Sequence, residues 1–193
     1  KRIYKSMNIG IFGGSFNPIH VGHCILANVL SQSGLVDEVW LTVSAQNPLK
    51  SADASLERHR LEMARRAVEQ CERVNVCDVE MSMPKPSYTI DTLNRLSQMY
   101  PEHRFRLIIG ADNWQIFDRW RESRRIVEHY GVIVYPRRGY EMPCGVEGVT
   151  AFEAPLIEIS STQIRESISR GDDVRFMVPD SVYDYIKKNK LYG

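Results

Sequence analysis

The sequence predicts an α/β protein of the Rossmann-like, doubly wound type, with a mainly parallel sheet and helices on both faces. Short apolar runs alternate with segments in which apolar residues recur every three or four positions. Its 193 residues suit a single domain, and 43% hydrophobic with 25% charged residues is an ordinary globular mixture. We expect one domain over residues 1–193, with 1–6 as a candidate flexible extension and a C-terminal helical part from about residue 160.

The expected elements follow from local patterns. Strands are predicted at residues 7–12, 38–43, 74–79, 105–109 and 131–135, and helices at 56–68, 87–99, 162–169 and 179–188. A further helix follows the first strand, because Ile25, Leu26, Val29 and Leu30 have helical spacing and Gly34 stands where it should end. A weaker apolar run lies at 156–159, after a long loop from 136 to 155. Ligands of such sheets bind beyond the carboxyl ends of the strands, where the strand order reverses.

Composition narrows the function classes. The 25 Lys and Arg nearly balance the 24 Asp and Glu, so the net charge of +1 gives no support for a nucleic-acid surface. Four scattered cysteines form no C-x-x-C pair, which argues against a zinc knuckle or a thioredoxin motif. No apolar run approaches the length of a membrane span. We therefore expect a cytoplasmic protein without nucleic-acid or membrane partners.

The stretch GGSFNPIHVGH, residues 13–23, is the first candidate site. Gly13 and Gly14 allow a close approach of backbone N–H groups to an anion. His20 and His23 are three residues apart and share a face if both are helical. The pair could bind zinc, bind phosphate or belong to the core. Zinc needs three or four ligands, and no third stands at a convincing spacing, so phosphate is favoured.

The stretch ISSTQIR, residues 159–165, is the second candidate site. Ser160 and Gln163 fit the capping-box pattern S-x-x-Q, which predicts a helix start. An ordinary well-capped helix would explain that much. Three consecutive hydroxyls followed by Arg165 exceed the needs of a cap and would also suit a polyphosphate, so both interpretations stay open.

Together, the two stretches resemble the G-x-F-x-P-x-H-x-G-H and I-S-S-T-x-x-R signatures of the nucleotidyltransferase α/β-phosphodiesterase superfamily. Within it, the chain resembles the bacterial nicotinate-nucleotide adenylyltransferases. The segments that carry this narrower resemblance are NPLK at 47–50, IIGADNW at 108–114 and VPDSVYDYIKKNKLY at 178–192.

The resemblance implies an enzyme of NAD biosynthesis that joins ATP and nicotinate mononucleotide, giving nicotinate adenine dinucleotide and pyrophosphate. The mononucleotide phosphate would attack the ATP α-phosphate directly and in line, with Mg²⁺ accompanying the ATP. Two alternatives stay open. One is a sister enzyme acting on nicotinamide mononucleotide or another phosphate ester, and the other is a nucleotide-binding module without catalysis. The oligomeric state is also open, and a homo-oligomer is one of its outcomes.

The resemblance also implies residue roles. Catalysis would fall to His20, His23 and Arg165, and ATP binding to Gly13, Gly14, Ser15, Phe16, Lys50, Ser161 and Thr162. The mononucleotide would contact Thr89, Gly110, Asp112, Trp120 and Arg138, and no metal ligands are expected on the protein. Lys50 fits a surface lysine equally well, and Trp114 and Trp40 compete with Trp120 for the pyridine ring. Arg121 replaces an aromatic residue that is frequent in the family, which leaves the contact to the ring carboxylate open.

Overall fold

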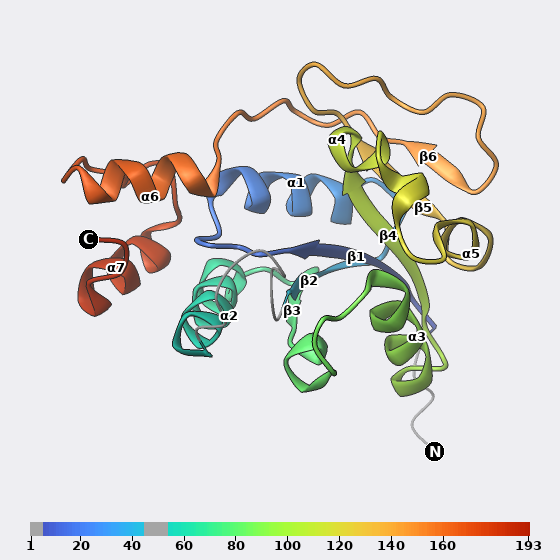
Figure 1. Ribbon diagram of the computed structural model, residues 1–193, viewed down its shortest axis with the longest axis horizontal. Coiled ribbons are helices and arrows are strands. Elements are labelled where there is room, and N and C mark those ends of the chain that lie inside the picture. The colour runs from blue at the N-terminus through green and yellow to red at the C-terminus, as the bar shows by residue number, and fades with distance from the viewer. Residues whose placement is uncertain (1–5, 45–53) are drawn as a thin grey trace.

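The computed structural model describes residues 6–44 and 54–193, which fold into a six-stranded sheet with helices on both faces (Figure 1). The strands are β1 (Asn8–Gly14), β2 (Glu38–Val43), β3 (Val74–Cys77), β4 (Arg104–Gly110), β5 (Val132–Tyr135) and β6 (Val149–Ala151). Their order is β3-β2-β1-β4-β5-β6, and each neighbouring pair is parallel. This confirms the predicted fold class.

Seven α-helices and two 3₁₀ turns accompany the described strands. The helices are α1 (Val21–Ser31), α2 (Ala54–Val68), α3 (Thr89–Met99), α4 (Ala111–Trp114), α5 (Ser123–His129), α6 (Ser161–Ser169) and α7 (Asp180–Asn189). The turns are η1 (Val79–Ser82) and η2 (Phe117–Arg119). None of the described helices has both the length and the apolar character that a membrane span requires.

The sheet separates two hydrophobic clusters, because successive side chains of a strand point to opposite faces. On β4, Leu107 and Ile109 enter one cluster and Ile108 enters the other. The Ile108 cluster also contains the buried faces of α1, α2 and α7, whereas the other contains those of α3 and α5. The strands are apolar on both sides for this reason, which is why they appear in the sequence as nearly continuous apolar runs.

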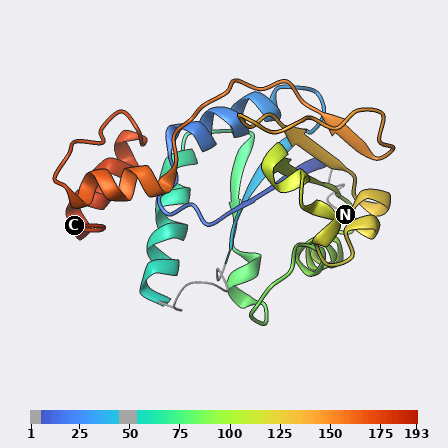
Figure 2. The same cartoon turned by 45° about the horizontal axis from the view of Figure 1, so that its top comes forward.

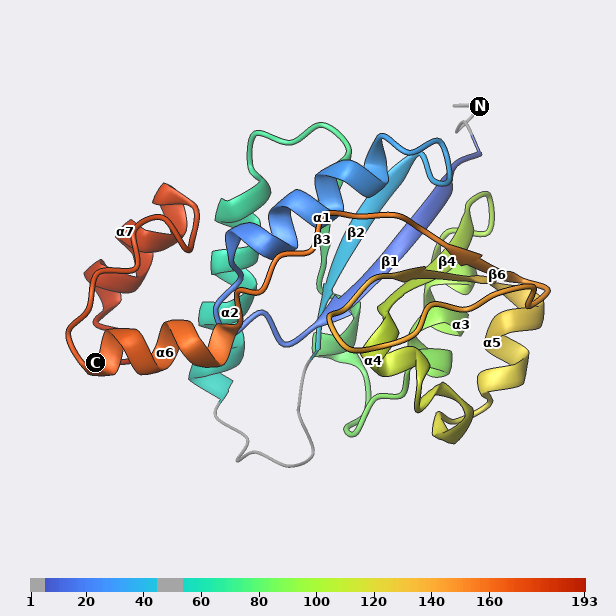
Figure 3. The same ribbon diagram turned by 90° about the horizontal axis from the view of Figure 1, so that it is seen from above.

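The two C-terminal helices lie at one end of the molecule, on the side of α2 and away from α5 (Figure 3). The Ser181 hydroxyl of α7 donates to the carbonyl of Arg66 at 3.0 Å, and Tyr185 lies 2.9 Å from Nδ1 of His59. Val182 and Ile186 are buried in the same cluster as α1. The C-terminal part therefore shares its core with the sheet.

Between β4 and the C-terminal helices, the structure differs from the sequence prediction. Three short elements, α4, η2 and α5, connect β4 to β5 where none was predicted, because seven residues or fewer carry too little periodicity to be recognised. Strand β6 lies inside the expected loop 136–155. The apolar run 156–159 is not a strand, since its segment runs along α1 toward α6 (Figure 2).

The sheet opens at the carboxyl end of β1. Its pairing with β2 continues to Gly14 opposite Val43, whereas its pairing with β4 ends at Phe12 opposite Ile108. The helices that follow β1 and β4 lie on opposite faces, so the two strands diverge here. This is the point at which α/β sheets bind their ligands.

We expect Leu93→Ala to lower the free energy of unfolding by about 2–5 kcal/mol, because it leaves a cavity where a fully buried α3 side chain packs on the sheet. Urea denaturation would measure the change. Arg95→Ala on the exposed face of α3 is the matched control and should stay within about 0.5 kcal/mol of the parent protein. Equal losses for the two variants would contradict the assigned packing of α3.

Candidate active site

The loop between β1 and α1, residues 15–18, has an unusual backbone. Phe16 adopts φ of +44°, and its side chain is only 1% exposed. A Cβ on Gly14 would come within 2.9 Å of the Phe16 ring, so glycine is required beneath it. The ring edge meets the imidazole of His23 at 5.0 Å between centroids. The loop conformation thus places the Phe16 ring against the imidazole of His23, a candidate site residue.

The two histidines lie together, although only one of them is helical. His20 is the N-cap of α1 with extended backbone angles, and His23 lies in the first turn. Their rings stack with centroids 3.6 Å apart, and the His20 backbone N–H donates to Nδ1 of His23 at 3.2 Å. A Cβ on Gly22 would come within 3.0 Å of the His20 ring, so the intervening glycine leaves room for the pair.

Burial keeps both imidazoles neutral at pH 7. It lowers the pKa of His20 from 6.5 to about 4, with a smaller contribution from the positive charge of Arg137. The pKa of His23 is lowered well below 6.5 by burial first, then by His20 and Arg137. Because Nδ1 of His23 accepts a hydrogen bond, its proton resides on Nε2, which is then a donor. The pair therefore supplies directional N–H groups rather than a fixed positive charge.

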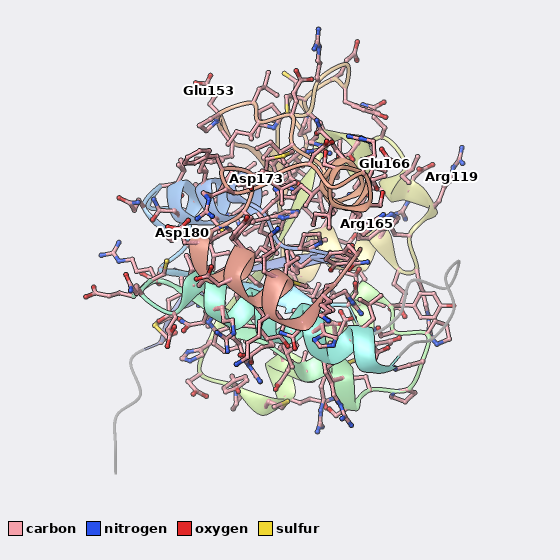
Figure 4. All side chains as sticks on the ribbon, turned by 90° about the vertical axis from the view of Figure 1, so that its left-hand side faces the viewer. Arg119, Glu153, Arg165, Glu166, Asp173 and Asp180 are labelled. Carbon is pink, nitrogen blue, oxygen red and sulfur yellow. The ribbon has the colours of Figure 1, made fainter. Side chains whose placement is uncertain are left out.

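The second candidate stretch forms the start of α6. The Ser160 hydroxyl caps the helix by accepting the N–H of Gln163 at 3.2 Å, as the capping-box pattern predicts. Arg165, labelled on α6 in Figure 4, donates to the Asn17 carbonyl at 2.7 Å and to the Thr162 hydroxyl at 3.2 Å. Ser161 donates to the carbonyl of Pro18 at 2.8 Å. The structure thus joins the two stretches through direct hydrogen bonds.

A cavity of about 540 Å³ lies between these elements at the carboxyl ends of β1, β4 and β5. Its lining includes His20, His23, Asp112, Arg137, Arg138 and Ser161. Nδ1 of His20 and Oδ1 of Asp112 are buried there without a hydrogen-bond partner. Unsatisfied buried polar atoms are costly, so this cavity is suited to a polar ligand.

Charges of both signs border this cavity. Arg137 lies 3.7 Å from the Asp112 carboxylate, and Arg138 pairs with Glu158 at 2.9 Å. The Arg138–Glu158 pair is largely exposed, with 78% and 57% of the two side chains accessible, so it adds little to stability. The guanidinium of Arg138 can therefore exchange its carboxylate partner for phosphate at little cost.

A second cavity, of about 240 Å³, adjoins the first, and Phe12, Asn113 and Tyr135 line both. Its lining includes Gly13, Gly14, Thr42, Thr89, Gly110 and Trp120. The Thr42 hydroxyl is buried there without a partner. Glu80 also lines this cavity, and its carboxylate accepts hydrogen bonds from Ser87 at 2.8 Å and Thr92 at 3.0 Å.

The two cavities contain only some of the predicted residues, because Ser15, Phe16, Thr162 and Arg165 line neither of them. Gly13 and Gly14, expected to bind ATP, line the smaller cavity. Asp112 and Arg138, expected beside the mononucleotide, line the larger cavity with the histidines. Lys50 and the NPLK segment lie outside the described residues. Among the tryptophans, Trp120 lines the smaller cavity, Trp114 stacks on Phe117 at 5.3 Å, and Trp40 packs against Tyr100.

Arg121, the residue that departs from the family pattern, contacts α3. Its guanidinium pairs with Asp91 at 3.3 Å and lies 4.9 Å from the centre of the Tyr88 ring. About half of the side chain is exposed. The two partners lie at the start of α3, so Arg121 fastens the chain after Trp120 to that helix.

Sequence reasoning missed several lining residues. These are Thr42, Glu80, Asn113, Tyr135 and Arg137. Thr42 and Tyr135 lie at the ends of strands, and the other three lie within three residues of a strand end. The rule that ligands bind at carboxyl ends could have identified all five.

An open groove of about 1080 Å³ beside α5 contains none of the unpartnered buried atoms found among the described residues.

Comparison with known proteins identifies relatives of this chain. The cytidylyltransferase-like family model matches residues 11–167. A Bacteroides fragilis protein named "probable nicotinate-nucleotide adenylyltransferase" is 48% identical over 180 residues, which cover 92% of this chain and 90% of that protein. A Porphyromonas gingivalis protein of the same name is 46% identical over 179 residues, 90% of each chain.

A solved structure shows the same fold. Plasmodium falciparum nicotinic acid mononucleotide adenylyltransferase, complexed with NaAD, matches with a TM-score of 0.79 at 22% identity over 98% of both chains. The chain therefore belongs to the cytidylyltransferase-like nucleotidyltransferases. Within that class it is a member of the nicotinate-nucleotide adenylyltransferase family, which confirms the resemblance predicted from its two signatures.

Because His20 is buried in its neutral form, we predict that the free energy of unfolding decreases as the pH is lowered. Between pH 6.5 and about 4 the unfolded chain binds a proton at this position that the folded chain does not, so acid favours unfolding. At 1.36 kcal/mol per pKa unit, the loss reaches about 3 kcal/mol at pH 4. Urea denaturation at a series of pH values would measure it.

His20→Asn should lose less stability than the parent protein over that pH range, because no buried imidazole remains at position 20 to be protonated. His129→Asn is the control, since His129 is exposed on α5, and it should follow the parent protein. Identical pH profiles for His20→Asn and the parent would contradict the prediction.

Proposed function

We propose that this chain transfers the adenylyl group of ATP to nicotinate mononucleotide, giving nicotinate adenine dinucleotide and pyrophosphate. The observation that carries the proposal is the meeting of two cavities at the opening between β1 and β4, each with an unpartnered buried polar atom. Two cavities in contact suit a reaction that joins two nucleotides. The names of the relatives agree with this choice of substrates.

The larger cavity is the better candidate for ATP. It combines the neutral donors His20 and His23 with the permanent charges of Arg137 and Arg138. Arginine suits phosphate oxygens because its planar fork donates to two of them at once. The Ser161 hydroxyl borders the same space from α6. These groups would fix the triphosphate and stabilise the charge that develops as pyrophosphate leaves.

The reaction requires little proton transfer. An oxygen of the mononucleotide phosphate forms a bond to the α-phosphorus, and the bond from that phosphorus to the oxygen bridging to the β-phosphate breaks. The electron pair leaves with pyrophosphate. Since the attacking phosphate is already anionic, no general base is required, and each neutral histidine keeps one N–H to donate. Catalysis then consists of alignment and charge stabilisation.

The smaller cavity is the better candidate for the pyridine nucleotide. Trp120 offers a flat face for the ring, and Thr89 is the first residue of α3, whose unpaired N–H groups favour an anion. A ring carboxylate would be stabilised there more than a neutral carboxamide. Glu80 lies at the same cavity, and its hydrogen bonds to Ser87 and Thr92 hold the first turns of α3.

Nucleotidyltransferases of this family generally use a divalent metal with ATP. We propose Mg²⁺ as that metal, entering as part of the nucleotide substrate and neutralising phosphate charge. Among residues 6–44 and 54–193, no three His, Cys, Asp or Glu side chains gather as a metal site would require. The buried oxygen of Asp112 in the larger cavity is the kind of ligand that such a cation accepts while keeping water and phosphate as its other ligands.

The choice of acceptor can be tested directly. With ATP and Mg²⁺ present, we expect pyrophosphate release with nicotinate mononucleotide to exceed that with nicotinamide mononucleotide by at least about tenfold in kcat/KM, because one good charge-assisted contact is worth that much. A coupled pyrophosphate assay measures both. Equal or better use of the amide would overturn the preference for the carboxylate. Nucleotide binding without pyrophosphate from either acceptor would indicate a non-catalytic module.

His20→Ala should abolish turnover while the fold survives, because it removes a donor from the phosphate site and leaves His23 without its stacking partner. Loss of one such donor costs about 2.7–4 kcal/mol in other enzymes, or about 10²–10³ in kcat. Pyrophosphate release and circular dichroism would check rate and fold. Asn28→Ala, on the exposed face of α1, should keep the parent rate. A folded His20→Ala protein with near-parental turnover would exclude the role.

A further inference from the structure

The loop 15–18 receives hydrogen bonds from residues far away in the chain. Arg60 of α2 donates to the Ser15 carbonyl at 2.7 Å. Tyr192, which follows α7, donates its hydroxyl to the Asn17 side-chain oxygen at 2.6 Å. Together with the bonds from α6 to Asn17 and Pro18, these contacts fix the loop through its oxygen atoms from three separate elements.

Arg60 and Tyr192 both contact the loop, and Arg60 is buried whereas Tyr192 is partly buried. Arg60 is only 6% exposed, although it carries a guanidinium group. Burial raises the pKa of Tyr192, opposed in part by the positive charges of Arg165 and Arg60. Tyr192 itself adopts φ of +68°, a left-handed conformation that non-glycine residues rarely occupy. Such strain persists only where surrounding contacts enforce it, and it concentrates at functional sites.

Two residues of the loop, Asn17 and Phe16, connect Tyr192 to the histidine pair. Asn17, which Tyr192 holds, follows Phe16, and the Phe16 ring edge meets His23. His23 in turn stacks on His20. A shift of the loop would therefore move the ring that supports the imidazoles, and even small displacements of aligned groups reduce catalytic rates.

We propose that Tyr192 is a positioning residue for adenylyl transfer, acting through Asn17 on the loop and the histidine pair. Arg60 holds the same loop at Ser15. The proposal rests on the proposed function, because it concerns the alignment of that reaction. Tyr192 contacts the loop rather than the cavity lining, so its effect should appear in rate more than in acceptor affinity.

Tyr192→Phe tests this by removing only the hydroxyl. Tyr185→Phe on α7 is the matched control, since it removes a hydroxyl that lies 2.9 Å from His59, away from the loop. We expect kcat to fall about tenfold for Tyr192→Phe, with KM for the acceptor within about twofold, while Tyr185→Phe keeps the parental kcat. Similar melting temperatures would show that both variants fold. Equal kcat for the two variants would overturn the proposal.

The route through Asn17 is tested by a double-mutant cycle. If Tyr192 acts through Asn17, the variant carrying Asn17→Ala and Tyr192→Phe should turn over no more slowly than Asn17→Ala alone. Independent, multiplying losses would show that Tyr192 acts by another route and would overturn the stated mechanism.

A measurement without turnover separates this inference from the proposed function. In NMR spectra of the ligand-free protein, we expect the imidazole signals of His20 and His23 to shift in Tyr192→Phe and to stay unchanged in Tyr185→Phe. If the parent protein used neither pyridine mononucleotide, the proposed function would fail, and this comparison would still decide whether Tyr192 positions the pair. Unshifted imidazole signals in Tyr192→Phe would exclude the positioning role.

Discussion

The divergence of β1 from β4 is the constraint on which the rest of the site depends. Strands on either side of this point continue the sheet in opposite directions, so their following helices leave for opposite faces. The backbone between them opens, and both cavities share the residues at its edges. Two ligands bound in these cavities would therefore approach one another from opposite faces of the sheet. The order of strands alone determines where the reaction can take place.

Electrostatic roles are divided between residue types around this opening. The histidines are buried and neutral, so they orient hydrogen bonds at little cost in charge desolvation, while exposed arginines keep their hydration until a phosphate arrives. An imidazolium in the place of His20 would face both desolvation and repulsion from Arg137. The negative charge of a bound phosphate would offset part of the repulsion from Arg137.

Much of the fold could be predicted from the sequence, because buried parallel strands are continuous apolar runs and the longer helices are amphipathic. The two signature stretches were also predicted to act together. Their means of contact could not be predicted, since Arg165 and Ser161 bind backbone carbonyls, which no side-chain pattern reveals. The short α4, η2 and α5 lack a full periodic repeat. The placement of Arg138 beside the histidines depends on how the irregular chain after β5 folds over the sheet, for which residue types carry little information.

The hydrogen bonds of the loop 15–18 also bear on how the protein is made. The donors on Ser161, Arg165 and Tyr192 stand 143, 148 and 175 residues after their acceptors. A ribosome releases the strand β1 and its loop long before it releases these donors, and contacts of such separation form late and slowly. The sheet and its first helices can assemble during synthesis, but the carbonyls of Asn17 and Pro18 and the side-chain oxygen of Asn17 lack these donors until α6 and the segment after α7 arrive. The nascent chain can therefore become compact well before the loop 15–18 is held in the position that the site requires.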